Sequence, residues 1–251
     1  MSLRLVSLNI NYRMLHNRAE VRKLCLRLKP DFLCLVETRP GDEKIFKGLL
    51  PHFKSHADKA FTWKGLMVAS RFPITSSSFH PGPWGMPSLT IHTKVKGRDL
   101  AVTGVHTIAT NPMSLPWSTL ISFFHRRRHI RSVAEAARVH RKPHLVAGDF
   151  NTTRSMFELG PILNTHEDAL RSVGAAGPTY RFGIPIRIDY IFSRGVVPVA
   201  GETIRTPFSD HDAVVLDFEL PGNDGMIKQH GKSKRKSGRN AHPAARRTHR
   251  P

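Results

Sequence analysis

Short runs of apolar residues recur along the chain and predict a protein with many strands. Some runs alternate apolar and polar positions, as half-buried strands do, and others are continuously apolar, as in strands buried on both faces. The predicted strands span residues 3–10, 31–37, 65–71, 89–95, 100–106, 145–147, 188–193 and 213–220. Helices are predicted at 21–28, 43–50, 115–141, 156–163 and 166–172. The clearest of them have apolar residues spaced three and four positions apart.

Polar residues follow directly where one of these strands ends. Gly148 closes the apolar run 145–147, and Asp149 and Asn151 come next, two residues apart. Residues i and i+2 of an extended chain point to the same side, so a carboxylate and an amide project together. Taken alone, this pair is explained equally well by a turn in which both side chains cap the backbone.

Similar polar residues lie at or beside other predicted strands, which makes coincidence a poorer explanation. They are Asn9, Glu37, His106, Asp189 and the adjacent pair Asp210 and His211. Carboxylates that gather in one place repel each other unless a cation balances them. A site of carboxylates and amides without cysteine suits Mg²⁺ (or Mn²⁺), which we therefore predict as the cofactor.

Charge points to a polyanionic partner. The 251-residue chain has a formal net charge of +20. Residues 222–251 hold nine Lys/Arg against one acid, a net of +8, which leaves +12 on residues 1–221. Nucleic acid, an anionic membrane surface and a phosphorylated substrate all fit this charge. Residues 222–251 have almost no large apolar side chains, so we expect a disordered basic tail after a domain at 1–221.

The remaining composition suggests a cytoplasmic protein. Cys25 and Cys34 lie among apolar neighbours and are expected to be buried, reduced thiols. No apolar run approaches the roughly 20 residues that span a bilayer, and the first residues predict a strand rather than a secretory signal.

The motifs together resemble the endonuclease/exonuclease/phosphatase superfamily. They are Leu8-Asn9-Ile10-Asn11, Leu35-Val36-Glu37-Thr38, Val105-His106, Gly148-Asp149-Phe150-Asn151, Arg187-Ile188-Asp189-Tyr190 and Ser209-Asp210-His211, in this order. The resemblance covers about residues 3–220. It implies an α+β fold, a four-layer α/β/β/α sandwich of two mostly antiparallel sheets flanked by helices.

The resemblance also implies a role for the predicted metal ligands. Glu37 would be the main ligand, supported by Asn9 and Asp210. Asn11 stands where some relatives have an aspartate, which makes a second metal site less favourable. Asn9 and Arg39 would also contact the phosphate.

The remaining site residues would carry out the chemistry. Asp149 would orient or deprotonate the attacking water, and Asn151 would hold a phosphate oxygen. His211 would contact the phosphate with its ring fixed by Asp189. His106 stands where relatives have a histidine or tyrosine that contacts the phosphate or assists the leaving group. The residues 62–65 lack the acid that pairs with this histidine in deoxyribonuclease-type relatives, so His106 is expected to bind phosphate rather than to act as a strong acid.

Three functions remain open at this point. The first is a metal-dependent phosphodiesterase, a nuclease that hydrolyses DNA or RNA with little sequence preference. The second keeps the chemistry but acts on a phospholipid or inositol phosphate at an anionic membrane surface. The third is a non-catalytic nucleic-acid-binding module, since a fold alone does not give a function. The sequence leaves endo- or exo-action and the oligomeric state undecided.

Overall fold

Two six-stranded sheets form the centre of the protein in a computed structural model, which describes residues 2–12, 18–57, 64–109, 116–139 and 143–221. In spatial order, the first sheet contains β11 (Val197–Ile204), β12 (Ala213–Glu219), β1 (Leu3–Asn9), β2 (Phe32–Thr38), β4 (Gly65–Ser70) and β3 (His52–His56). The second contains β5 (Ile74–Pro81), β6 (Pro87–Val95), β7 (Arg98–His106), β8 (His144–Asp149), β10 (Asp189–Arg194) and β9 (Glu167–Asp168).

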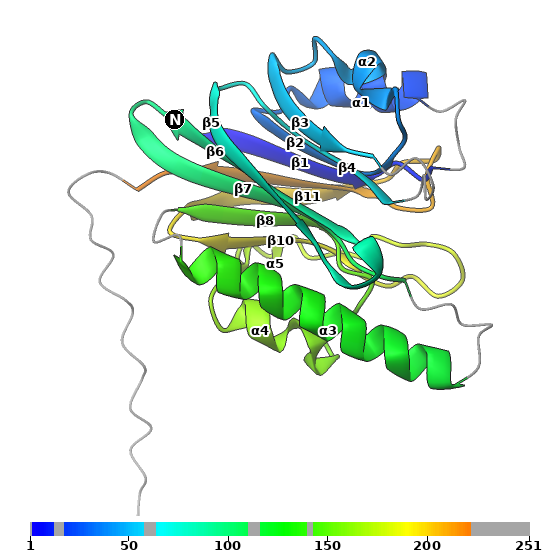
Figure 1. Ribbon diagram of the computed structural model, residues 1–251. Coiled ribbons are helices and arrows are strands. Elements are labelled where there is room, and N and C mark those ends of the chain that lie inside the picture. The colour runs from blue at the N-terminus through cyan, green and yellow to red at the C-terminus, as the bar shows by residue number, and fades with distance from the viewer. Residues whose placement is uncertain (1, 13–17, 58–63, 110–115, 140–142, 222–251) are drawn as a thin grey trace, which may run out of the picture. The chain divides into compact units, whose positions relative to one another are not determined.

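Helices cover the outer face of each sheet (Figure 1). α1 (Arg18–Leu28) and α2 (Asp42–Phe46) lie on the first sheet, and α3 (Pro116–Val139) and α4 (Gly160–Leu163) lie on the second. α5 (Ala169–Ser172) packs near β10 and β11. The expected four-layer sandwich is therefore confirmed.

Side-chain alternation explains why most positions of the interior strands are buried. In β2, Phe32, Cys34 and Val36 face the second sheet, whereas Leu33 and Leu35 face the helices. Strands of the second sheet alternate in the same way, with one set of side chains toward the first sheet and the other toward α3 and α4. Each interior strand is thus buried on both faces.

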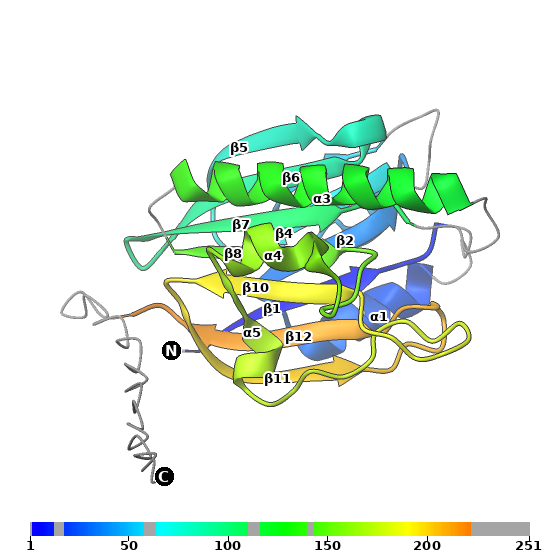
Figure 2. The ribbon, with the colours of Figure 1, turned by 90° about the horizontal axis from the view of Figure 1, so that it is seen from below.

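Strand direction brings several strand ends to one end of the sandwich. Each sheet is mixed: β1 runs parallel to β2, β7 runs parallel to β8, and the other neighbours are antiparallel. In the register of the second sheet, Asp149 lies opposite both His106 and Asp189. Figure 2 shows β1, β8 and the start of β10 meeting at this end.

Some predicted elements differ from the structure. Strands β3, β5, β9 and β11 were not predicted, and helix 43–50 is limited to α2, followed by an isolated bridge between Lys47 and Leu50. The region 166–172 contains the short strand β9 before α5. Arg126, one of the basic residues of α3, is buried.

Within the residues that the structure describes, no helix is both long and apolar enough to cross a membrane. The predicted basic tail, residues 222–251, lies outside the described residues.

Candidate active site

Four predicted site residues share the face between the two sheets. Asn9 continues the inward-facing positions of β1, and His106, Asp149 and Asp189 do the same in β7, β8 and β10. All four are at least 95% buried. Asn9, His106 and Asp149 end their strands and Asp189 begins the antiparallel strand β10, so the sheets themselves bring these polar groups together.

Glu37 reaches the site through a break in the strand pattern. The pairing of β2 with β4 shifts between Val36 and Thr38, and Glu37 has a left-handed backbone with φ of 62°. Regular alternation would direct its side chain toward the helices. The bulge redirects the side chain, and a left-handed conformation at a residue other than glycine is a strain commonly found at functional sites.

Asn9 connects the two sheets at the site. Its Nδ2 donates to Glu37 Oε1 at 3.1 Å and to Asp149 Oδ2 at 3.0 Å. The backbone N–H of Tyr12 donates to Glu37 Oε2 at 3.1 Å. Burial nevertheless raises the pKa of Glu37, although these hydrogen bonds oppose the rise. A nearby cation would favour the ionised form of this carboxylate.

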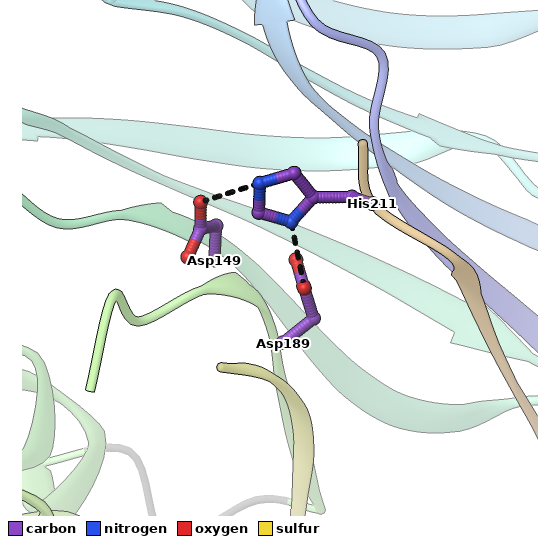
Figure 3. A group of neighbouring side chains, drawn as sticks. All are labelled: Asp149, Asp189 and His211. Carbon is purple, nitrogen blue, oxygen red and sulfur yellow. Dashed lines mark hydrogen bonds and ion pairs between the residues drawn. The ribbon is translucent and has the colours of Figure 1, made fainter. Parts of the chain in front are cut away.

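His211 lies between two aspartates (Figure 3). Its Nδ1 is 2.8 Å from Asp189 Oδ2, and its Nε2 is 3.8 Å from Asp149 Oδ2. Burial alone lowers the pKa of His211, but the charges of Asp189 and Asp149 outweigh it and raise the pKa to about 10. Burial and the charge of Asp189 raise the pKa of Asp149, while His211 opposes this shift. The geometry holds a protonated imidazole with one nitrogen fixed by Asp189.

Asp210 and Asn151 are held beside this group. Asn11 Nδ2 donates to Asp210 Oδ1 at 2.9 Å, and the N–H of Asn11 donates to Asn9 Oδ1 at 3.0 Å. The N–H of Asn151 donates to Asp149 Oδ1 at 2.8 Å, and its Nδ2 donates to the Thr107 carbonyl at 2.9 Å. The turn proposed as the simpler explanation for Asp149 and Asn151 is therefore present, in addition to the clustering.

His106 is buried beside Glu37. Its Nε2 is 3.9 Å from Glu37 Oε1. Burial, with smaller effects from His211 and His129, lowers the pKa of His106 to about 3. At neutral pH the ring is therefore uncharged, and it can donate one hydrogen bond to a ligand oxygen.

Arg39 lies near the site. Within the part of the chain that the structure describes, it makes no direct contact with the carboxylates of the site. Its backbone N–H donates to Asp42 Oδ2 at 2.7 Å, and its guanidinium lies 5.6 Å from the centre of the Tyr12 ring. The backbone N–H of Tyr12 also donates to Glu37, so Arg39 is connected to the site through Tyr12.

Two sets of side chains offer ligands for a cation. The predicted ligands Glu37, Asp210 and Asn9 would supply only oxygen atoms, and the Glu37 side chain keeps 18% of its surface exposed. This donor set fits Mg²⁺ or Mn²⁺. The second set is Asp149, Asp189 and His211, whose ligand atoms lie within 4.8 Å of one another. In the second set a charged His211 already balances the carboxylates.

Sequence reasoning missed three residues that support the site. Tyr180 packs its ring 5.0 Å from that of His211, and Thr179 Oγ1 accepts from the N–H of Asp189 at 3.0 Å. Ser209 Oγ donates to the Asn9 carbonyl at 2.8 Å and accepts from the N–H of His211. Only Ser209 had a sequence signal, since it opens the motif that contains Asp210 and His211.

Comparison with solved structures identifies the same sandwich in other proteins. TDP2 from D. rerio, solved as a complex with a single-strand DNA product, matches with a TM-score of 0.72 and 18% identity over 87% of this chain and 99% of that chain. A functionally unknown conserved protein from Enterococcus faecalis V583 matches with a TM-score of 0.72 and 16% identity, over 87% and 100% of the chains. These identities show similarity of fold alone.

A third structure is described as an endonuclease/exonuclease/phosphatase, from Beutenbergia cavernae DSM 12333. It matches with a TM-score of 0.68 and 22% identity, over 88% of this chain and 72% of that chain. A search of curated proteins gives no match. The sequence model of the Endonuclease/Exonuclease/phosphatase family, in contrast, matches residues 6–211. The chain therefore belongs to this family and is a hydrolase of phosphoester bonds.

Proposed function

We propose that this protein is a divalent-metal-dependent phosphodiesterase that cleaves DNA or RNA with little sequence preference. One observation carries the proposal: His211, held by Asp189 and close to Asp149, lies at the same strand ends as Glu37. Such a group combines a positive donor, a candidate base and a metal-binding carboxylate, which are the components that hydrolysis of a phosphodiester requires.

The metal ligands in this proposal are Glu37, Asp210 and Asn9. A divalent ion held there would neutralise charge on the phosphate oxygens and on the leaving alkoxide. The hydrogen bonds from Asn9 to Glu37 and from Asn11 to Asp210 support these assignments, because they hold both carboxylates in fixed orientations.

The chain's own residues position the reacting groups. Asp149 orients the attacking water and accepts its proton, since its carboxylate is held by Asn9 and by the N–H of Asn151. His211 donates from Nε2 to a phosphate oxygen, with Asp189 holding the orientation of the ring at Nδ1. Asn151 and neutral His106 donate further hydrogen bonds to the phosphate, and Arg39 contacts it at the rim.

Charge supports nucleic acid as the substrate. Residues 1–221 have a net charge of +12, which gives affinity for phosphates without selecting bases. The D. rerio TDP2 structure contains a single-strand DNA product and has the same fold. Cleavage is expected to decrease as salt concentration rises, because counterions compete for the same basic surface.

The test is incubation of plasmid and single-stranded DNA or RNA with Mg²⁺ or Mn²⁺. Wild type is expected to cleave, whereas Glu37→Gln and His211→Ala are expected to reduce cleavage at least about 100-fold. Glu219→Gln, at the end of β12, and exposed His80→Ala serve as matched controls and should retain activity. No cleavage of any nucleic acid under varied metals would refute the substrate assignment. Headgroup or phosphate release from phospholipid or inositol phosphate would then identify the alternative substrate.

A further inference from the structure

The outer face of α3 carries a continuous stripe of side chains that are exposed, apart from the half-buried Arg127. Its first part is apolar: Trp117, Leu120, Ile121 and Phe124 expose 74%, 46%, 45% and 60% of their surface. The spacing of three and four residues places them on one side of the helix. Arg127, Arg128 and Arg131 continue the same side toward the C-terminus. We call these seven residues the α3 outer stripe.

The opposite side of α3 already has its partner. His129, Ile130, Val133, Ala134 and Ala137 are buried against the second sheet and its neighbours. The helix therefore does not need its outer stripe to attach to the fold. Protein surfaces that face water rarely contain so many large apolar residues side by side unless they bind another molecule.

Two residues that follow Asn151 in the chain enlarge the apolar part. Met156 and Phe157 expose 52% and 59% of their surface. The ring of Phe157 lies 4.3 Å from that of Phe123, and the Arg127 guanidinium lies 5.0 Å from its centre. An exposed aromatic surface thus meets the beginning of the basic row.

The basic part forms two shallow hollows. One, of about 630 Å³, is lined by Phe124, Arg127, Arg128, Arg131, Ser132 and Glu135. The other, of about 290 Å³, lies between α3 and α4 and receives Arg127, Arg131 and Arg138, with Glu135 as its acid. Three guanidinium groups against one carboxylate make the second hollow suitable for an anionic headgroup.

We propose that the α3 outer stripe binds the surface of an anionic phospholipid bilayer. Leu120, Ile121 and the aromatic side chains would enter the boundary between headgroups and acyl chains, while the arginines contact the lipid phosphates. Nucleic acid supplies phosphates but no aliphatic partner for Leu120 and Ile121. A second copy, or the basic residues 222–251, would bring positive charge against the arginine row.

This binding mode would keep the protein's active site close to the bilayer. β7 ends at His106, and α3 begins after the segment that follows, so the apolar part of the stripe lies toward the catalytic end of the second sheet (Figure 1). The inference concerns a surface outside the catalytic cluster and does not depend on the proposed chemistry.

Flotation of the full chain with vesicles tests the proposal. Vesicles of phosphatidylcholine mixed with phosphatidylglycerol should bind it, and vesicles of phosphatidylcholine alone should bind it far more weakly. Phe124→Ser should weaken binding about tenfold, because a phenylalanine side chain leaves the acyl boundary. The double variant Arg128→Ala/Arg131→Ala should weaken it roughly 30-fold, since each arginine contributes about fivefold near an anionic surface.

Matched controls come from the helix layer on the other sheet. Leu26→Ser and Arg27→Ala on α1 change similarly exposed residues and should leave binding unchanged. All variants retain residues 222–251, so any contribution of this segment cancels in the comparison. Equal binding by the α3 variants and wild type would overturn the proposal.

Tryptophan fluorescence adds a readout that requires no loss of binding. The fluorescence emission of Trp117 is expected to shift to shorter wavelength when anionic vesicles are added, and Trp117→Phe should remove this shift. Absence of the shift in wild type would overturn insertion of the stripe. Variants that lose single-stranded DNA binding but keep vesicle binding would assign the stripe to nucleic acid instead.

Discussion

A buried ion pair between Arg126 and Glu158 offers a direct test of how α3 is tied to the active site. Arg126 Nε and Glu158 Oε1 are 2.7 Å apart, and their side chains are only 6% and 1% exposed. Arg126 also donates to the Ile108 carbonyl at 3.0 Å, and Thr152 donates to Glu158. The pair therefore links α3 to the segments that follow His106 and Asn151.

Removing one charge of this pair should destabilise the protein strongly. Arg126→Met leaves the Glu158 carboxylate buried without its cation, and Glu158→Gln leaves the Arg126 guanidinium without its anion. Each change should lower the free energy of unfolding by about 3–5 kcal/mol, the usual effect of an uncompensated buried charge. The double variant should lose only about 1–2 kcal/mol, because no unpaired charge remains and Thr152 keeps an acceptor.

Urea unfolding followed by fluorescence and circular dichroism measures these losses on the full chain. The exposed pair of Lys23 and Glu20, also 2.7 Å apart but 72% and 50% exposed, is the matched control. The same two substitutions there, Lys23→Met and Glu20→Gln, should cost less than about 1 kcal/mol each. If the losses at Arg126 and Glu158 simply add in the double variant, the pair is not a coupled buried charge pair and the reasoning is wrong.

Three further predictions follow from buried residues. Gly148→Ala should destabilise the protein by several kcal/mol or prevent folding, because a Cβ there would lie 2.0 Å from a backbone carbonyl oxygen of β7. The control is Gly97→Ala, where the φ is 80° and a Cβ would meet no other atom. It should cost only ~1–2 kcal/mol in the same unfolding assay. His129 is buried with neither ring nitrogen hydrogen-bonded within the described residues, and burial lowers its pKa from 6.5 to about 4. As pH decreases below 6.5, His129 should therefore contribute a loss of stability of about 2 kcal/mol near pH ~5. If His129→Leu loses as much stability as wild type between pH ~7 and pH ~5, the assignment is wrong. Asp189→Asn should preserve the fold but reduce kcat about 100-fold or more, since His211 loses the negative charge that holds and stabilises its protonated ring. An unchanged kcat would remove Asp189 from the proposed mechanism.

The strands that sequence analysis predicted are the interior strands of the two sheets. β1 and β8, for example, are almost fully buried, so both strands are rich in apolar residues and easily recognised. The missed strands β3, β5, β9 and β11 are all sheet edges. β5 and β11 are mostly exposed or half-buried, so their serine, proline and glycine residues give little periodic signal.

The site was predicted as a set of residues but not as an arrangement. Asn9, Asp149 and Asp189 follow from strand alternation once the strands are paired, yet the pairing itself joins residues far apart in the chain. Glu37 could not be oriented from sequence, because a bulge reverses the direction that alternation gives it. The partners Tyr180 and Thr179 come from a loop whose path depends on packing against His211 and β10.

The hydrogen bonds of Asn9 have a consequence for how the protein gains activity during folding. Asn9 and Glu37 belong to one sheet and Asp149 to the other, so no half of the sandwich contains a working site. A chain with one sheet formed would therefore be inert toward its substrate. Conversely, any ligand that engages both layers would resist their separation, and the unfolding temperature would rise as the ligand concentration increases.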